Sequence, residues 1–285
     1  MSNTASKINF DHGSGEHAPD LYSPESLARG LNTFGDVTDA DIDFYHENGF
    51  LIIENAFDAE EIEVATAGLL DLIMGSNPEF KNVSYEAQAK ERLEQLTVEQ
   101  RQDAVRKLMN FCDYDERLRA ISLHPQLLAV LEMMLAGTPK VYQEMALVKP
   151  PKIGREKPWH QDHAYFKIPT DSSCIGVWIA LDETTPENGC MHLMPQMYGK
   201  PILHYQRRDW QICDTTMDGH KCLAVPLKPG GCLFFSSLLP HGTPTNKTES
   251  RRRALQFHYV HKDIETLDPD VHKGLFGGEY VGQVC

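Results

Sequence analysis

The chain has 285 residues, of which 41% are hydrophobic, so it is long enough for one large domain or two small ones with a sizeable core. Its formal net charge of −14 argues against nucleic acid and against an anionic membrane as partners. The sequence contains no run of about 18 apolar residues, so it predicts no membrane span.

The amino terminus and the cysteines predict a cytoplasmic location. Residues 1–15 are polar and lack the apolar segment of a secretory signal. The seven cysteines are scattered from Cys112 to Cys285 without Cys-x-x-Cys spacing, which indicates free thiols in a reducing compartment.

The first third of the chain is predicted to be mainly helical. Residues 1–36 mix Gly, Ser, Pro and charge without a period, and we expect an arm that lies on the surface or is partly disordered. Thr38 begins a short helix, with Asp41 reaching back to complete the cap, and Gly49 ends it. A buried strand is expected over residues 50–54.

A second helix is expected after Asp58, because Glu61 follows three residues later and completes a capping box. Its apolar stripe consists of Ile62, Ala65, Leu69 and Ile73. The helical signal continues over residues 85–136, and its last helix begins at Pro125 and ends at Gly137. The helical part therefore spans about residues 37–137.

After Gly137 the pattern changes to short apolar strands separated by Pro and Gly turns. The expected strands cover residues 141–149, 175–182, 191–194, 222–227, 232–236 and 254–261. Many short strands predict a barrel or a double-sheet jelly roll, and because the helices precede the strands, βαβ units are not expected. Residues 196–221 form a long connection that is expected to line or cover a site.

Two histidines and one aspartate have a spacing that suits a metal ion. His160 and Asp162 are two residues apart, so on an extended strand both side chains point to the same face. Together with His241 they offer two imidazoles and one carboxylate. This trio can occupy one face of an octahedral Fe(II) and leave positions open for a co-substrate and O₂.

An arginine downstream of His241 completes the pattern. The planar guanidinium of Arg252 suits bidentate binding of a carboxylate. On a strand, Arg252 would face opposite to Arg251 and Arg253, which indicates one buried functional arginine between two outer ones.

The chain also contains histidines that imitate this pattern. His261 and Asp263 repeat the His-x-Asp spacing, but no suitably spaced His and Arg follow them. His258 and His261 could also pass for a ligand pair. A hydrogen-bonded trio inside a barrel is the structural alternative to a metal site at His160, Asp162 and His241.

Motifs in the second half of the sequence resemble the phytanoyl-CoA dioxygenase family. They are Lys149-Pro150-Pro151, His160-Gln161-Asp162 with Tyr165-Phe166, Asn188-Gly189-Cys190, Pro229-Gly230-Gly231, His241-Gly242-Thr243 and Arg252-Arg253-Ala254, with Gly49-Phe50-Leu51 near the start. The resemblance covers roughly residues 37–262. It implies a fold that is mainly β with N-terminal helices, a cupin-like double-stranded β-helix, and a requirement for Fe(II), 2-oxoglutarate and O₂, with ascorbate as the reductant in vitro.

On this basis residues 37–285 are expected to form a single oxygenase domain after the arm of residues 1–36. Its jelly-roll core spans about residues 138–262, and residues 263–285 form a C-terminal tail.

The resemblance also implies roles for individual residues. His160, Asp162 and His241 would bind iron, while Arg252, helped by the hydroxyl of Thr243, would bind the distal carboxylate of 2-oxoglutarate. Three further residues would lie beside the co-substrate, with core packing or an ordinary surface position as the alternative: Trp178, Met145 and Lys107. Four residues within or after the metal-binding motif are candidates for contact with the substrate: Gln161, His163, Tyr165 and Phe166.

The implied reaction is hydroxylation of a small organic metabolite, with conversion of 2-oxoglutarate to succinate and CO₂. Asp162 favours oxygenation, because halogenases of this fold carry a small residue at that position. Two alternatives are a metal-binding jelly-roll protein without turnover and a cupin-type metalloenzyme that does not use 2-oxoglutarate. The sequence leaves open the identity of the substrate and whether it is a coenzyme A ester. It also leaves open the oligomeric state and whether the outcome is hydroxylation, desaturation or another oxidation.

Overall fold

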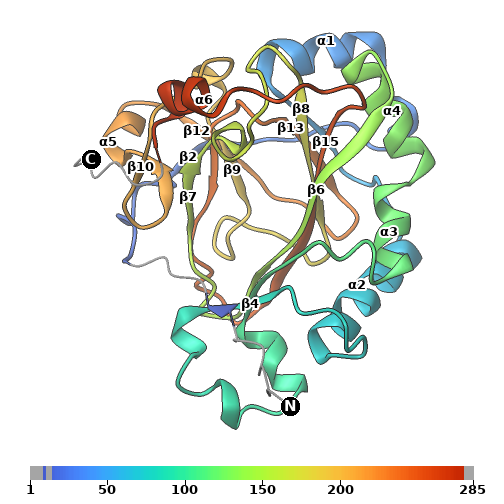
Figure 1. The fold of residues 1–285 in the computed structure, drawn as a ribbon, viewed down its shortest axis with the longest axis vertical. Coiled ribbons are helices and arrows are strands. Elements are labelled where there is room, and N and C mark those ends of the chain that lie inside the picture. Colours follow the sequence, from blue (N-terminus) through green and yellow to red (C-terminus); the bar gives the residue numbers. More distant parts are fainter. Residues whose placement is uncertain (1–8, 11–14, 279–285) are drawn as a thin grey trace.

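The structure, a computed structural model, describes residues 9–10 and 15–278 of the chain. Within this part, two larger β-sheets lie opposite one another, and helices cover the outer side of one of them (Figure 1). This arrangement is the double-stranded β-helix, or jelly roll, that the sequence predicts.

The major sheet has eight strands in the order β1-β4-β5-β6-β15-β8-β13-β3. Their bounds are β1 (Asn9–Phe10), β3 (Phe50–Ile53), β4 (Val83–Tyr85), β5 (Val105–Met109), β6 (Pro139–Lys149), β8 (Cys174–Ala180), β13 (Cys232–Ser236) and β15 (Arg252–His261). The central strand β15 pairs antiparallel with both β6 and β8.

The minor sheet has five strands in the order β2-β12-β9-β14-β7. Their bounds are β2 (Pro24–Leu27), β7 (Lys157–His160), β9 (Met191–Leu193), β12 (Cys222–Val225) and β14 (His241–Thr243). A separate antiparallel pair, β10 (His204–Gln206) and β11 (Trp210–Ile212), lies in the long connection over residues 196–221.

Helices α1 (Asp39–Asn48), α2 (Ala59–Met74), α3 (Glu116–Ser122) and α4 (Pro125–Leu135) lie on the outer side of the major sheet (Figure 1). Leu69 of α2 and Leu131 of α4 are fully buried in one core cluster with Val177 of β8 and Phe257 of β15. Two short helices, α5 (Asp214–Met217) and α6 (Pro269–Phe276), lie on the side of the minor sheet. Helix-to-sheet packing therefore forms the larger part of the core.

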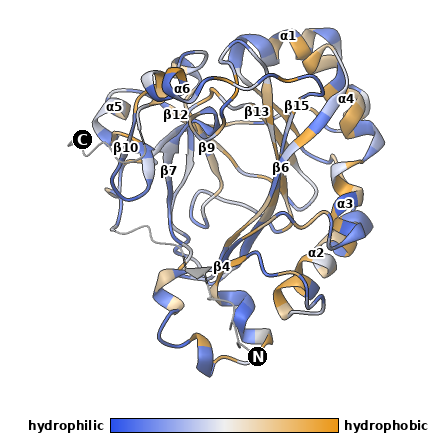
Figure 2. Ribbon diagram, viewed as in Figure 1, coloured by the Kyte–Doolittle hydropathy of each residue, from blue (hydrophilic) through white to orange (hydrophobic). Residues whose placement is uncertain are grey.

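The central strands of the major sheet are buried on both faces. In β8, Val177 belongs to the core under the helices, whereas Trp178 belongs to the core between the sheets. Phe234 and Phe235 of β13 divide in the same way. Figure 2 shows the hydrophobic colouring along β13, which is expected for a strand covered on both faces.

The first helix begins and ends where the sequence predicts, and the second begins where it predicts. The Oδ2 atom of Asp41 accepts from the backbone N–H of Thr38 at 2.9 Å, and Gly49 ends α1 in the left-handed conformation with φ of 81°. Asp58 accepts from the N–H of Glu61 at 2.9 Å at the start of α2. The predicted stripe of α2 is buried.

The predicted helical stretch over residues 85–136 is wrong for residues 85–109, whereas its later part contains α3 and α4. Residues 85–109 instead contain three 3₁₀ segments, over residues 87–89, 93–95 and 99–104, followed by the strand β5, which pairs antiparallel with β6. Leu108 is fully buried in that pairing, and Val105, which pairs with Tyr85 of β4, is fully buried as well. The charged residues that indicate a solvated helix include Arg106 and Lys107, which line an internal cavity, so tertiary contacts outweigh helix propensity here.

The described part of the expected arm, residues 15–36, lies mostly on the surface, as the sequence predicts, but part of it also joins a sheet. The strand β2 pairs parallel with β12 and extends the minor sheet. Just before it, Tyr22 is buried, stacks on Trp159 at 5.2 Å between ring centroids, and donates a 2.7 Å hydrogen bond to Glu156. Residues 1–8 and 11–14 lie outside the described residues.

The tail after residue 262 also packs against the domain. The helix α6 ends at Phe276, whose side chain is fully buried and stacks on the ring of His163 at 5.8 Å. The tail therefore supports the turn that carries the metal-binding motif. Residues 279–285 lie outside the described part of the chain.

One stretch, Glu116–Leu135, is long and apolar enough by length and composition to cross a membrane. It consists of the two separate helices α3 and α4, and its Leu118 and Leu131 are fully buried in the domain core. We therefore assign this stretch to the packed core of the domain.

The expectation of free thiols holds for five cysteines and fails for one. The free thiols are Cys112, Cys174, Cys190, Cys222 and Cys232. Cys213 is disulfide-bonded.

The packing of Tyr22 gives a stability prediction. Tyr22→Ala should lower the free energy of unfolding by about 3–5 kcal/mol, because it removes a buried aromatic ring and its hydrogen bond to Glu156. Urea unfolding followed by circular dichroism measures this loss. Phe44→Ala, at a site that is 42% exposed, is the matched control and should cost much less. Equal midpoints for the two variants would show that the segment before β2 contributes nothing to the fold.

Candidate active site

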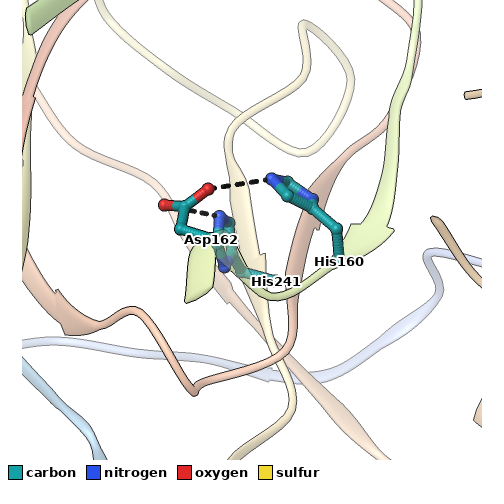
Figure 3. Close-up of side chains that lie close together, drawn as sticks. All are labelled: His160, Asp162 and His241. Atoms are coloured by element: carbon teal, nitrogen blue, oxygen red, sulfur yellow. Dashed lines mark ion pairs between the residues drawn. The ribbon is translucent and has the colours of Figure 1, made fainter. Parts of the chain in front are cut away.

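Three potential metal ligands meet inside the jelly roll (Figure 3). His160 is the last residue of β7, and His241 is the first residue of β14, directly opposite it in the sheet. Asp162 begins a 3₁₀ turn over Asp162–Tyr165. One ligand atom from each side chain lies within 4.8 Å of the other two, and all three residues are buried. The structure therefore brings together the residues that the sequence selects.

Asp162 does not lie on the strand that the spacing predicts. The chain leaves β7 after His160, and the turn places the carboxylate beside the imidazoles. Nε2 of His160 is 3.2 Å from Oδ1 of Asp162, and Nε2 of His241 is 3.5 Å from Oδ2. The spacing thus gives the right neighbours through a different backbone geometry.

The hydrogen bonds of the two imidazoles prepare them for a metal ion. Nδ1 of His160 lies 2.7 Å from the carbonyl oxygen of Pro158, and Nδ1 of His241 lies 2.9 Å from that of Leu239. A carbonyl oxygen only accepts, so each Nδ1 carries the hydrogen and each Nε2 presents a lone pair. These lone pairs face the carboxylate oxygens, and a divalent cation between them would relieve the repulsion.

The protonation states also fit a metal site. Burial and repulsion from His160 lower the pKa of His241 to about 3, so its imidazole is neutral at pH 7. Burial raises the pKa of Asp162, but attraction to the surrounding imidazoles outweighs it and holds that pKa well below its usual range. Two imidazoles and one carboxylate are the donor set of Fe(II) oxygenases with open coordination positions.

The ligands open into a cavity of about 240 Å³. Five cationic and two acidic side chains line it. The cations are Arg106, Lys107, Lys149, Lys157 and Arg252, and the acids are Asp162 and Asp209. A chain with a net charge of −14 thus encloses a predominantly cationic cavity.

Arg252 is 2% exposed and lines this cavity where β15 begins. Its Nη1 donates to the carbonyl oxygen of Leu147 at 3.1 Å, and its guanidinium carbon lies 5.5 Å from the centroid of the Trp178 ring. Nε has no hydrogen-bond partner among the described residues. A buried guanidinium with an unpaired N–H group is suited to bind a carboxylate.

The neighbours of Arg252 point elsewhere, as strand alternation predicts. Arg251 is exposed and pairs with Asp103, and Arg253 pairs with Asp182 at 2.7 Å. Burial and repulsion from Arg106 lower the pKa of Arg252 to about 9, so an anion bound beside it would favour its charged form.

Lys149 is a second buried cation that the sequence analysis does not assign to the site. It lies directly opposite Arg252 in the pairing of β6 with β15, and its ammonium donates to the carbonyl oxygens of Arg155 and Thr243. Burial, and repulsion from Arg106 and Arg252, hold its pKa well below the usual range. Lys149 could have been assigned to the site from the pairing of β6 with β15, because paired residues point to the same face of a sheet and Lys149 is paired with Arg252.

The other candidates for the co-substrate divide into two groups. Thr243, Met145 and Lys107 line the cavity, with Lys107 on the strand β5 instead of a helix. Trp178 does not line it; the ring is fully buried between the sheets and packs behind the guanidinium of Arg252. Contact of each residue with 2-oxoglutarate stays a prediction.

The four substrate candidates divide in the same manner. Tyr165 and Phe166 line the cavity. Gln161 is fully buried outside it, where its side chain donates to the carbonyl oxygens of Lys200 and Leu238. These bonds give Gln161 an anchoring role in place of the expected contact with the substrate.

His163 is the second substrate candidate that faces away from the cavity. Its Nδ1 lies 2.8 Å from the hydroxyl of Ser237, and its Nε2 lies 3.2 Å from the carbonyl oxygens of Ile168 and Pro169. Like Gln161, it holds the turn from the outside, because the 3₁₀ turn does not keep successive side chains on one face.

The imitating histidines do not form a second metal site. Among the described residues, the group with metal-binding geometry contains His160, Asp162 and His241 alone. His261 is at the end of β15, where Nδ1 lies 3.8 Å from the 72%-exposed carboxylate of Asp263. His258 lies inside the barrel, 2.7 Å from Oδ2 of Asp162. The two histidines therefore do not form a ligand pair.

A jelly roll with two histidines and one aspartate in this geometry defines the class of non-haem iron oxygenases. The family model described as phytanoyl-CoA dioxygenase matches residues 45–254, and the chain belongs to this family. It is an Fe(II)- and 2-oxoglutarate-dependent dioxygenase, as the sequence predicts.

Individual relatives agree with this assignment. The peroxisomal phytanoyl-CoA dioxygenase of Mus musculus is 25% identical over 267 residues, which cover 90% of this chain and 77% of that one. A methylphosphonate hydroxylase of Gimesia maris is 36% identical over 129 residues, 44% of this chain and 47% of that one. The solved structure of SnoK, a non-haem α-ketoglutarate-dependent carbocyclase from nogalamycin biosynthesis, has a similar fold, with a TM-score of 0.64, 20% identity and coverage of 90% and 98%.

When bound, Fe(II) with 2-oxoglutarate and O₂ supplies the oxidising power to replace a C–H bond by C–OH, with release of succinate and CO₂. His160, Asp162 and His241 would hold the ion, and Arg252 would orient the co-substrate. The family assignment decides against the two alternatives left open by the sequence, a binding protein without turnover and a cupin that does not use 2-oxoglutarate.

The metal assignment predicts the behaviour of four variants. His160→Ala, Asp162→Ala and His241→Ala should each lose iron, measured by elemental analysis, and lose 2-oxoglutarate-dependent succinate release, because each removes one of three ligands. His261→Ala is the control and should keep both. Loss of iron from the control, or full activity in any of the other three, would contradict the assignment.

The position of Arg252 predicts a selective defect in co-substrate binding. Arg252→Lys replaces a two-pronged donor by a point charge, so one charge-assisted hydrogen bond of about 1.5–3 kcal/mol is lost. The apparent KM for 2-oxoglutarate should rise about 10- to 150-fold with unchanged iron content. Arg251→Lys is the matched control. Equal titration curves for the two variants would remove Arg252 from the co-substrate site.

Proposed function

We propose that the enzyme hydroxylates a small organic anion. The observation that carries the proposal is the excess of cationic side chains around the cavity, five against two carboxylates. Fe(II) and 2-oxoglutarate bring equal and opposite charges, so binding both leaves the excess in place. Glu86 lies 3.6 Å from Arg106 and offsets one further charge. Even when Lys149, whose pKa is lowered by burial and by its cationic neighbours, is left out of the count, one positive charge remains for an anionic substrate to balance.

The size of the cavity supports a small substrate. Sites for drug-sized ligands usually measure about 300–1,000 Å³. This cavity measures about 240 Å³ and also has to hold 2-oxoglutarate. A coenzyme A ester would leave its nucleotide outside, where Lys152, in the basic segment after Lys149, is already paired with Glu249. We therefore favour a small metabolite over a coenzyme A ester.

Lys157 is the cation that we expect to meet the substrate. Its ammonium donates to the hydroxyl of Tyr165 at 3.0 Å and to Asp209 at 2.9 Å, which leaves one N–H for a ligand. Burial lowers the pKa of Lys157, but Tyr165 and Asp209 raise it above its ordinary value, so the group stays charged. Tyr165 also donates to the carbonyl oxygen of Trp210 at 2.6 Å, which fixes the long connection against the cavity wall.

A phosphonate is the first anion to test. The support is the methylphosphonate hydroxylase of Gimesia maris among the relatives. Because that similarity covers less than half of the chain, carboxylates and sulfonates of similar size belong to the same proposal.

A cytoplasmic location is part of the proposal. The support is that five cysteines among the described residues are free thiols, against one, Cys213, that is disulfide-bonded. Fractionation of the source cells, with detection by antibody, tests it; enrichment in an exported or membrane fraction would contradict it.

The proposal predicts selectivity for charge. Short phosphonates or carboxylates should raise succinate release above the substrate-free rate, whereas neutral amides and alcohols of the same size should not. Lys157→Gln should raise the apparent KM for the active anion about tenfold, because a charge-assisted hydrogen bond is lost at a partly exposed site. The KM for 2-oxoglutarate should stay the same.

The matched control is Lys140→Gln, at an exposed lysine of β6 outside the cavity. It should leave both KM values unchanged. The anionic-substrate proposal fails if neutral analogues stimulate turnover as strongly as the anions, or if Lys157→Gln behaves like the control.

A further inference from the structure

Two side chains of β15 reach Asp162 from the major sheet. Nε2 of His258 lies 2.7 Å from Oδ2 of Asp162, and Nε2 of Gln256 lies 3.3 Å from the same oxygen. The other oxygen, Oδ1, meets only Nε2 of His160 within the described part of the chain. Nε2 of His241 also lies 3.5 Å from Oδ2, so the two carboxylate oxygens differ in that Oδ2 alone is approached by donors from β15.

The short contact fixes the hydrogen of His258. A carboxylate accepts hydrogen bonds, so Nε2 carries the hydrogen and donates it to Oδ2. The amide nitrogen of Gln256 lies 3.3 Å from Nε2 of His258 and is aimed at the same carboxylate. Two donors thus converge on a single oxygen of Asp162.

Beyond Asp162 and Gln256, the ring of His258 has aromatic neighbours in the described part of the chain. Its ring is fully buried, 4.8 Å from the ring of Phe166 and 6.3 Å from that of Phe235, measured between centroids. Nδ1 has no hydrogen-bond partner among the described residues. A buried nitrogen without a partner destabilises the fold, so an apolar residue would pack better here unless the bond to Asp162 has a function.

We propose that His258, assisted by Gln256, is a positioning residue that makes Asp162 bind the metal through Oδ1 alone. With Oδ2 occupied by two donors, the carboxylate cannot turn to give the metal both oxygens. A two-oxygen mode would fill a coordination position that 2-oxoglutarate or O₂ needs. The inference rests on the metal site and not on the choice of an anionic substrate.

His258 is not proposed as a ligand itself. The group of ligand atoms within 4.8 Å of one another contains His160, Asp162 and His241 and does not include His258. Its action on the metal is through the carboxylate, as is usual for residues that hydrogen-bond to metal ligands.

The test uses the two amides that each reproduce one nitrogen of imidazole. In His258→Gln the amide nitrogen can take the place of Nε2, whereas in His258→Asn it is near the place of Nδ1 and cannot reach Asp162. His258→Leu removes both nitrogens. We expect about a 10- to 100-fold loss of Mn(II) affinity in the Asn and Leu variants, and affinity within a few-fold of the parent in the Gln variant.

The affinity is measured by calorimetry with Mn(II) and apoprotein, so the readout needs no substrate and no turnover. The visible spectrum of the Co(II)-loaded protein supplies the second readout, because its intensity falls as the coordination number rises. The Asn and Leu variants should show the weaker, more highly coordinated spectrum, and the Gln variant should match the parent.

Thermal unfolding of the apoproteins separates positioning from folding, and His261→Gln is the control histidine outside the site. Gln256→Leu removes the second donor to Oδ2 and should weaken Mn(II) binding to a smaller extent. This variant tests the proposal even if the variants at position 258 do not fold. The proposal is overturned if the Asn and Leu variants bind Mn(II) like the parent, or if the Gln variant loses as much affinity as the Leu variant. Either result would leave the proposed anionic substrate untouched.

Discussion

The carboxylate of Asp162 is contacted by side chains from both sheets of this jelly roll. His160 and His241 approach it from paired strands of the minor sheet, and His258 approaches it from the central strand of the major sheet. A buried carboxylate is costly unless it is paired and hydrogen-bonded, so these partners are a condition for the fold as well as for metal binding. The end of β7, the start of β14 and the position of His258 within β15 have to be aligned for these side chains to meet. The site therefore depends on contacts between residues that are far apart in the chain.

The second constraint is the separation of charge. The chain is strongly acidic, yet the wall of its internal cavity is mainly cationic. Backbone oxygens help to stabilise the buried cations: Arg106 donates to the carbonyl oxygens of Arg155 and Glu156, at 2.6 and 2.8 Å, and Lys149 also donates to that of Arg155. Carbonyl dipoles stabilise a buried positive charge without neutralising it, so the cavity keeps its attraction for anions. The same arrangement is unfavourable for the charged forms of Arg252 and Lys149, because their pKa values are both lowered by burial and by neighbouring cations. An anionic co-substrate favours these charged forms on binding.

The sequence predicts the parts of this structure that depend on local rules. Capping residues such as Thr38 and Asp58, and strand alternation around Arg252, act over a few residues and are confirmed. Local rules do not predict the strand β5, because it depends on pairing with β6, which is distant in the chain. In that pairing its charged residues Arg106 and Lys107 line the cavity, whereas the local pattern indicates a solvent-exposed helix. The same limit applies to His258. It shares a strand face with Arg252 and Gln256, but its partner Asp162 is distant in the chain and lies on a turn that alternation does not describe.

That turn carries both a metal ligand and the side chains that are proposed to meet the substrate. Within a few residues, Asp162 and Tyr165 line the cavity while Gln161 and His163 are anchored outside it. The outer pair fixes the turn to the backbone at Leu238 and the hydroxyl of Ser237, and stacking on Phe276 adds support from the C-terminal helix. Because these contacts hold the backbone of the turn from outside the cavity, the cavity-lining side chains of Tyr165 and Phe166 can be substituted without moving the carboxylate of Asp162. Substitutions among the cavity-lining residues after Asp162 could therefore alter the substrate while the iron site stays intact, a physical basis on which one metal centre can serve relatives that act on different molecules.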